Sequence, residues 1–292
     1  MTMLKTSTTA GIWFFISTIT LAQASAAPIQ TEVKTGRFQT AFSIPSKLGT
    51  YGEMIERFAG EKGLRNLDAN MAEDGLTIDK YEAFTVTLAE ETYEVYVPPA
   101  YEPAKPIGIM VYIPARDSGS PHPQYLPVLD DRYMIYIAAN LSGNRQSPIL
   151  RRAPLALHAL ENMSRIYNID PARVYASGLS GGGKMAVYLG LNYGDHFTGA
   201  LFIIGSLSVS DRARMAPTGA VKKLVQTRNR YVFLTGRQDF NRKEIRRHRL
   251  AFRRFGIQNT LLIDDISLAH RPPPEKLILR AVRALDGLPE KK

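Results

Sequence analysis

The chain has 292 residues, of which 45% are hydrophobic and 22% are charged. This composition is typical of a globular protein, and the length permits one large domain or two small ones without metal or disulfide staples. The sequence contains no cysteine, which excludes disulfide bonds and lipid attachment through cysteine, and its formal net charge is +10.

The first 26 residues have the features of an export signal. Lys5 precedes the apolar run AGIWFFISTITLA, and the small residues Ala24-Ser25-Ala26 form an A-x-A type cleavage site. The run is shorter than the roughly 20 residues that span a bilayer, which favours cleavage over retention as an anchor. We predict a signal peptide at residues 1–26 and export to a bacterial periplasm or the medium, which the absence of cysteine also favours. We expect no membrane contact after its removal.

Residues 27–80 follow the signal and show no strong hydrophobic period. They predict an irregular N-terminal arm packed on the domain, with one helix near Tyr51 to Ala59. The pattern then changes to segments of strand character. FTVTLAE (84–90) and TYEVYVP (92–98) predict two strands that pair with each other.

Strands and helices alternate from there to the end of the chain. IGIMVYIP (107–114) and RYMIYIAA (132–139) are almost entirely apolar, as expected for strands covered on both faces in a parallel sheet. The alternation predicts one α/β domain over residues 81–292, with a mainly parallel sheet of about eight strands flanked by helices. The remaining strands are RVYAS, GALFIIG, RYVFLTG and NTLLIDDI, and the helices include residues 154–167, the segment KMAVYLGL, a basic helix between the last two strands, and residues 275–285.

The segment VYASGLSGGGKMAVYLG, residues 174–190, fits two incompatible motifs. GLSGGGK matches G-x-x-x-x-G-K, a loop whose amides cradle phosphate, and LLIDD resembles the acidic strand that accompanies it. However, Met185 stands where a hydroxyl should bind magnesium, and a thioether is a poor ligand for that cation. The motif also lies late in the chain, and export would remove the protein from nucleotides. We therefore favour the second motif.

The second motif is G-x-S-x-G, the sharp turn between a strand and a helix that presents a nucleophilic serine. Gly178 and Gly182 supply the small residues that let the helix and the strand approach closely around Ser180. The amide of Gly181 would then donate to the developing oxyanion. The alternative is a glycine-rich turn without catalytic function, which the position between a strand and a helix disfavours.

A serine hydroxyl needs a base, and in the order Ser–Asp–His the two partners follow later strands. His270 comes directly after the last predicted strand, and Asp239 follows RYVFLTG. Asp264 and Asp265 are rival acids, but they fall inside a strand. We expect His270 to exchange the Ser180 proton and Asp239 to orient the imidazole. The other histidines precede the serine or lie on helices: His122, His158, His196 and His248.

Three further residues are candidates for the rim of the site. The second oxyanion amide should follow the strand 107–114, which points to Ala115, with Arg116 equally placed. Arg116 could contact substrate or be a surface charge, and Asn140 could line the pocket or serve a turn. We expect no metal and no cofactor.

The basic segment RKEIRRHRLAFRR, residues 242–254, contains seven Lys and Arg residues and one histidine. Ile245, His248, Phe252 and Phe255 lie at helical spacing and could face the core, which favours an ordinary solvated surface helix. Attraction to an anionic polymer or to lipid head groups is the alternative. Nucleic acid is not an expected partner of an exported chain.

Over about residues 80–287 the sequence resembles the α/β-hydrolase superfamily, and more closely the exported esterases of the polyhydroxybutyrate-depolymerase-like kind. The resemblance lies in YEVYVPPAY, IDPARVYASGLSGGGKMA, TGRQDFNR and the late AH before a proline run. It implies an ester hydrolase in which Ser180, Asp239 and His270 match the catalytic motif positions. The secreted depolymerases usually carry cysteines and a polymer-binding domain, which this chain does not show. A polymer ester and a smaller ester, such as an acylated sugar or a feruloyl ester, therefore both remain candidate substrates. The rival hypothesis is a noncatalytic exported binding protein that uses the basic helix to hold an anionic polymer.

Overall fold

A computed structural model describes residues 33–58, 83–209 and 217–288. The predicted signal peptide and residues 27–32 and 59–80 of the predicted arm lie outside this part of the chain. Of the segment 206–220, the structure describes residues 206–209 and 217–220.

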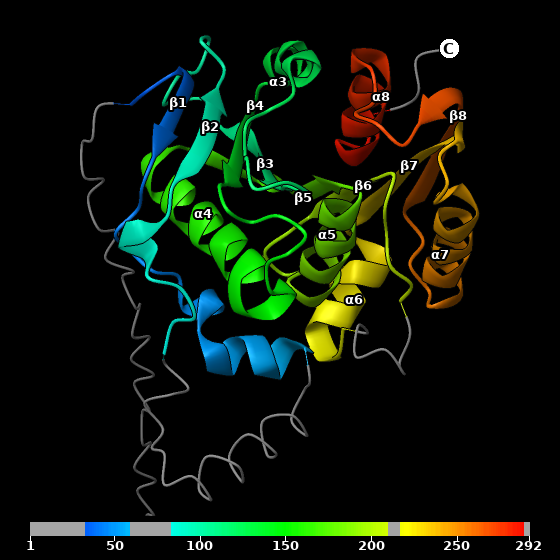
Figure 1. The fold of residues 1–292 in the computed structure, drawn as a ribbon, viewed down its shortest axis with the longest axis horizontal. Helices are drawn as coiled ribbons and strands as arrows, with labels where there is room; N and C mark the ends of the chain where they lie inside the picture. The colour runs from blue at the N-terminus through cyan, green and yellow to red at the C-terminus, as the bar shows by residue number, and fades with distance from the viewer. Residues whose placement is uncertain (1–32, 59–82, 210–216, 289–292) are drawn as a thin grey trace, which may run out of the picture.

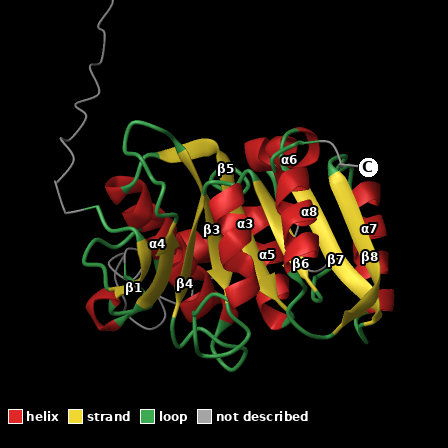
Figure 2. Cartoon of the chain, turned by 90° about the horizontal axis from the view of Figure 1, so that it is seen from above, coloured by secondary structure: helices red, strands yellow, loops and turns green. Residues whose placement is uncertain are grey.

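One eight-stranded sheet forms the centre of the molecule, with helices on both of its faces (Figures 1 and 2). The strand order is β1-β2-β4-β3-β5-β6-β7-β8. Strands β3 to β8 run parallel, whereas β2 is antiparallel to both of its neighbours, β1 and β4. The mainly parallel sheet predicted from the sequence is therefore confirmed. The strands are β1 (Gly36–Thr40), β2 (Tyr93–Val97), β3 (Ile107–Ile113), β4 (Met134–Ala139), β5 (Ile169–Leu179), β6 (Gly199–Ile203), β7 (Arg230–Gln238) and β8 (Thr260–Ala269).

Helices cover the two faces of the sheet unequally, as Figure 1 shows. Four helices pack on one face together with the helical residues 51–58, and two pack on the other. The first face carries α4 (Ala153–Ile166), α5 (Gly181–Asn192), α6 (Gly219–Thr227) and α7 (Arg242–Arg254), and the second carries α3 (Leu126–Asp131) and α8 (Glu275–Leu285). None of the described helices combines the length and the apolar character needed to cross a membrane.

The apolar strand patterns build both halves of the core. In β3 every residue is buried. Ile109 and Val111 pack into the cluster under α4 and α5, while Met110 and Tyr112 pack into the cluster under α3 and α8. Successive side chains of a strand point to opposite faces, so an unbroken apolar run is what a strand covered on both sides requires.

The N-terminal part of the chain differs from the sequence prediction. Residues 84–90 do not form a strand paired with β2: Phe84 makes one isolated bridge with Thr50, and Leu88–Glu90 is a 3-10 turn. The partner of β2 at this edge is β1, from the arm that we predicted to be irregular. The helix expected near Tyr51 is confirmed over the described residues 51–58.

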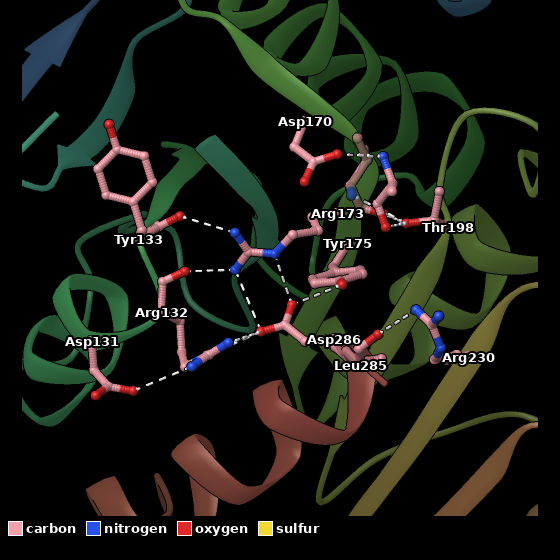
Figure 3. Close-up of polar contacts among 12 residues, drawn as sticks. Asp131, Arg132, Tyr133, Asp170, Arg173, Tyr175, Thr198, Arg230, Leu285 and Asp286 are labelled. Carbon is pink, nitrogen blue, oxygen red and sulfur yellow. Dashed lines mark hydrogen bonds and ion pairs between the residues drawn. The ribbon is translucent and has the colours of Figure 1, made fainter. Parts of the chain in front are cut away.

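A buried carboxylate joins three segments at the rim of the sheet where the parallel strands begin (Figure 3). Asp286, which follows α8, accepts hydrogen bonds from the guanidinium groups of Arg132 and Arg173 and from the Tyr175 hydroxyl. The shortest Arg132 contact is 2.7 Å, and the Asp286 side chain is only 5% exposed. This cluster ties the end of α8 to β5 and to the turn before β4.

Candidate active site

Three polar side chains lie together at the opposite rim of the sheet, where the parallel strands end. Ser180 follows β5, Asp239 follows β7 and His270 follows β8. Because β5, β6, β7 and β8 are parallel neighbours, their carboxyl ends meet at one rim. The order of the strands therefore brings together side chains that are up to 90 residues apart in the sequence.

Ser180 occupies a strained turn at the start of α5. Its φ of 56° and ψ of −116° place a residue with a Cβ in a sparsely populated region of backbone conformation. The turn is held by the Ser180 amide, which donates to the Ile203 carbonyl at 2.8 Å. A Cβ at Gly182 would overlap the Ile113 carbonyl oxygen, and one at Gly178 would overlap the Gly182 carbonyl. Glycine at these two positions permits the close packing that holds the half-buried serine at the rim.

A chain of hydrogen bonds connects the three side chains. The Ser180 hydroxyl oxygen lies 3.0 Å from His270 Nε2, and His270 Nδ1 lies 2.8 Å from Asp239 Oδ1. Asp239 also accepts from the Thr235 hydroxyl at 2.6 Å and from the Asn241 amide at 3.0 Å. The carboxylate side chain is fully buried, and the imidazole is 21% exposed. This geometry allows His270 to take the serine proton while Asp239 holds the ring and stabilises its cation.

An exposed aromatic ring lies against the imidazole. Phe240 follows Asp239, and its ring centroid is 3.9 Å from that of His270 in a stacked arrangement. The Phe240 side chain is 77% exposed, an unusual state for so large an apolar group. It forms an apolar surface beside the atom through which a leaving group would be protonated.

The predicted oxyanion donors lie on either side of the turn. Gly181 is the first residue of α5, so its amide has no acceptor within the helix and the positive end of the helix dipole points toward Ser180. Ala115 follows the end of β3, where Ile113 and Pro114 pack against Gly182. Gly181 is therefore adjacent to the serine, and Ala115 follows the residues that pack against the same turn.

A buried arginine supports the loop that carries Ala115. Arg152 is 4% exposed and donates to the Pro114 carbonyl at 2.8 Å and to the Ser142 carbonyl at 2.9 Å. Burial lowers its pKa to about 10, so the guanidinium keeps its charge at neutral pH. In a trans peptide the carbonyl and the next N–H point in opposite directions, and therefore a fixed Pro114 carbonyl also fixes the Ala115 N–H.

The two substrate-binding candidates differ in their surroundings. Arg116 is exposed beside the rim, and its charge, together with the larger effect of burial, lowers the pKa of His122. Asn140 instead joins loops: its side-chain oxygen accepts from the Gly119 amide at 2.9 Å, and its nitrogen donates to the Thr92 hydroxyl at 3.1 Å. This arrangement corresponds to the turn role that the sequence left open for Asn140.

Sequence reasoning missed three residues at the site: Asn144, Arg152 and Phe240. The Asn144 side-chain oxygen lies so close to Gly181 that a Cβ on that glycine would overlap it. No local pattern marks Asn144 or Arg152, because their contacts join separate loops. Phe240 had a usable signal, since it is adjacent to the predicted acid Asp239.

The alternatives weighed from the sequence have other environments. Met185 is buried in the core. Its sulfur therefore cannot face a cation bound at a phosphate-binding loop. Asp264 pairs with Arg242 and Arg246 rather than with a histidine. Within the described ranges, no group of three or more His, Asp or Glu side chains is arranged to hold a metal ion.

A second serine–histidine contact lies nearby but has a different character. The Ser206 hydroxyl is 3.0 Å from His248 Nδ1, and Glu244 is 3.8 Å from the other ring nitrogen. Ser206 is only 1% exposed, so a substrate cannot reach it. Burial is the main cause of the lowered pKa of His248. This pair joins the loop after β6 to α7 and has no open face for chemistry.

Comparison with known proteins shows the fold. No family model matches the sequence, and no curated protein matches it. Among solved structures, the chain is similar to FphF, a fluorophosphonate-binding serine hydrolase of Staphylococcus aureus, with a TM-score of 0.53, 15% identity, and coverage of 68% of this chain and 93% of that one. The chain has the α/β-hydrolase fold.

Two further α/β-hydrolase structures give the same result. The Est2 esterase of Thermogutta terrifontis, in its butyrate-bound form, matches with a TM-score of 0.50 and 19% identity over 70% of this chain and 90% of that one. A ferulic acid esterase matches with a TM-score of 0.50 and 15% identity over 67% and 92%. The fold predicted from the sequence resemblance is therefore confirmed, and the matches cover nearly the full length of these α/β-hydrolases.

Proposed function

We propose that this protein is a serine hydrolase that cleaves carboxylic esters through an acyl-enzyme. The observation that carries the proposal is the hydrogen-bonded chain from the Ser180 hydroxyl through the His270 ring to the buried Asp239 carboxylate. Ser180 is the nucleophile, His270 the general base and acid, and Asp239 the orienting acid. The structurally similar proteins named as serine hydrolase and esterases support the same chemistry.

The reaction follows from this geometry in two steps. His270 Nε2 takes the proton of Ser180 as its oxygen attacks the ester carbonyl, and the amides of Gly181 and Ala115 donate to the oxyanion. The imidazolium then gives the proton to the departing alcohol, which leaves the acyl group on Ser180. In the second step His270 activates water, and the carboxylic acid is released as the serine is restored.

The substrate class follows from the surroundings of His270. The departing alcohol must lie beside Nε2, next to the exposed ring of Phe240. An apolar or aromatic alcohol would cover this ring and remove apolar surface from water. We propose an ester whose departing alcohol is apolar or aromatic, cleaved by an exported protein of the periplasm or the medium.

The test is a panel of short nitrophenyl esters and matched alkyl esters, assayed with the chain lacking residues 1–26. We expect turnover by the wild type and a loss of about 10⁴-fold or more in kcat for Ser180→Ala. Ser206→Ala, which alters the buried serine, is the control and should stay active. Absence of turnover across the panel, or equal activity of Ser180→Ala and wild type, would refute the proposal.

A further inference from the structure

Helix α7 has two faces of opposite character. Ile245 and Phe252 are buried in the core, and His248, Ala251 and Phe255 line the same inner face. The outer face is exposed and cationic. Its exposed residues recur at helical spacing along the whole helix: Lys243, Arg246, Arg247, Leu250, Arg253 and Arg254.

The charge of this outer face is not balanced within the described part of the chain. Arg242 and Arg246 share one carboxylate, Asp264. Glu244 is the only acid on the helix, and it lies beside His248. Burial and the neighbouring Arg253 lower the pKa of Arg249, so like charges lie close together on this helix. Such crowding is unfavourable for the isolated protein and is relieved by an anionic ligand.

We propose that the outer face of α7 is a docking surface for a linear anionic polysaccharide. From residue 243 to residue 254 the exposed cations form a row about 16 Å long, at the helical rise of about 1.5 Å per residue, with Leu250 between its two groups of cations. A row of this kind suits an extended polymer whose anionic groups repeat along one direction. The bidentate guanidinium of arginine suits sulfate and carboxylate groups.

The composition of the surface argues against two other polyanions. No aromatic side chain is exposed on the outer face of α7, so nothing there can stack on the bases of a single-stranded nucleic acid. Leu250 is the one large apolar residue exposed on the described helix, whereas a membrane-surface helix presents a broad apolar face to the lipid. On α7 that face is already buried against the sheet.

The outer face of α7 begins close to the candidate active site, but binding at this face does not require the site to be active. Arg242, the first residue of α7, comes three positions after Asp239, so the row of cations begins near the catalytic rim and runs away from it. A polymer held along α7 would keep the site close to that polymer or to the material that carries it. Binding is a separate property from hydrolysis and stands even if the chain does not cleave esters.

The test measures binding of heparin, as a sulfated linear polysaccharide, at several salt concentrations. The variant combines Arg247→Gln, Arg253→Gln and Arg254→Gln, none of which pairs with a described carboxylate. The control combines Lys34→Gln, Lys47→Gln and Lys105→Gln, which remove the same net charge from exposed positions. These lysines belong to the part of the chain around β1 to β3, whereas α7 connects β7 and β8 at the other end of the strand order. We expect the α7 variant to bind about tenfold or more weakly, and the control to stay within about twofold of wild type.

Several results would overturn this proposal. They are no measurable heparin binding by the wild type, equal weakening in both triple variants, and tighter binding to vesicles of anionic phospholipid or to DNA than to heparin. Circular dichroism and esterase turnover of both variants verify that the fold is intact. The Ser180→Ala protein should bind heparin like the wild type, so a failure of the ester proposal and a failure of the docking proposal are distinguishable.

Discussion

Each rim of the sheet holds a buried carboxylate that accepts from several donors, and the partners of these two carboxylates separate the candidate site from the framework. Asp286 accepts from two guanidinium groups and a hydroxyl at the rim where the parallel strands begin. Asp239 accepts from a hydroxyl, an amide and the ring of His270 at the rim where they end. Arginine keeps its proton across the working pH range, whereas histidine exchanges its proton near neutral pH.

Asp286 and Asp239 are both buried, but their different partners give them different roles. The partners of Asp286 cannot change charge, so that cluster is a fixed connection between α8, β5 and the turn before β4 (Figure 3). The partner of Asp239 is a histidine, and its other ring nitrogen meets the serine hydroxyl. Removing either carboxylate should therefore disturb a different property of the protein.

The largest effect is expected from Asp239→Asn. The asparagine side chain could donate an N–H to His270 Nδ1 instead of accepting a hydrogen bond from it. The ring would then carry its proton on Nε2 and could not take the serine proton. We expect kcat for a nitrophenyl ester to fall by about 10³–10⁴-fold with little change in the thermal midpoint. Asp265→Asn is the control, because this carboxylate lies on β8 and accepts from Ser267 rather than from a histidine. Retention of more than a tenth of the activity by Asp239→Asn would contradict the role assigned to Asp239.

Asp286→Asn should affect stability rather than chemistry. It leaves Arg132 and Arg173 without their buried counter-charge, and breaking such a group costs about 3–5 kcal/mol. We expect the free energy of unfolding in urea to fall by that amount and kcat of the remaining folded protein to stay within about twofold. A large loss of kcat without destabilisation would show that the two rims are not separate in function.

A third buried group sharpens the comparison through its pH dependence. His158 is fully buried, accepts from the Ser46 amide at 2.9 Å, and has its pKa lowered from 6.5 to about 4, mainly by burial. Glu161 opposes this shift. Because the unfolded chain takes up this proton first, the stability is fully present above pH 6.5 and is lost as the pH falls toward 4.

The measurement is the free energy of unfolding between pH 7 and pH 4.5 for the wild type and for His158→Gln. From the shift of the His158 pKa we expect the wild type to lose about 2–3 kcal/mol more than the variant over this range. Parallel losses in the two proteins would mean that His158 is not kept neutral in the folded state.

The smallest effect tests whether Arg152 positions the oxyanion loop. For Arg152→Met we expect kcat to fall by about 10–100-fold with KM nearly unchanged, since the Ala115 amide acts on the transition state. Arg152→Lys should restore part of kcat, because it can still donate to the Pro114 carbonyl. Arg165→Met, an exposed change at the far end of α4, is the control. If Arg152→Met instead lost stability or raised KM while kcat stayed unchanged, the role of Arg152 would be purely structural.

The sequence located the elements of the candidate site because the relevant signals are local. Ser180 lies in a glycine turn after a strand, and Asp239 and His270 are the polar residues that directly follow two later strands. The identity of β1 was not predictable in the same way. Residues 84–90 precede β2 directly in the sequence, whereas residues 36–40 lie beside it in the folded protein. The alternation of apolar and polar residues in such short segments does not determine which of them pairs with β2.

The contacts at both rims of the sheet also depend on long-range geometry. Arg132 and Asp286 are 154 residues apart, and Arg152 reaches Pro114 across two loops. Neither pairing leaves a spacing that can be recognised along the chain. The excess of cations on residues 242–254 was visible, but only the fold shows that Arg242 and Arg246 share Asp264 and that the other exposed cations of this helix pair with no described carboxylate.

The role of Ser180 as an activated nucleophile is tested by reaction with a fluorophosphonate probe and peptide mapping by mass spectrometry. We predict one adduct, on the peptide that contains Ser180, formed by the wild type and by Ser206→Ala and strongly slowed in His270→Ala. Absence of an adduct on Ser180 in the folded wild type, or an adduct on Ser206 instead, would contradict it.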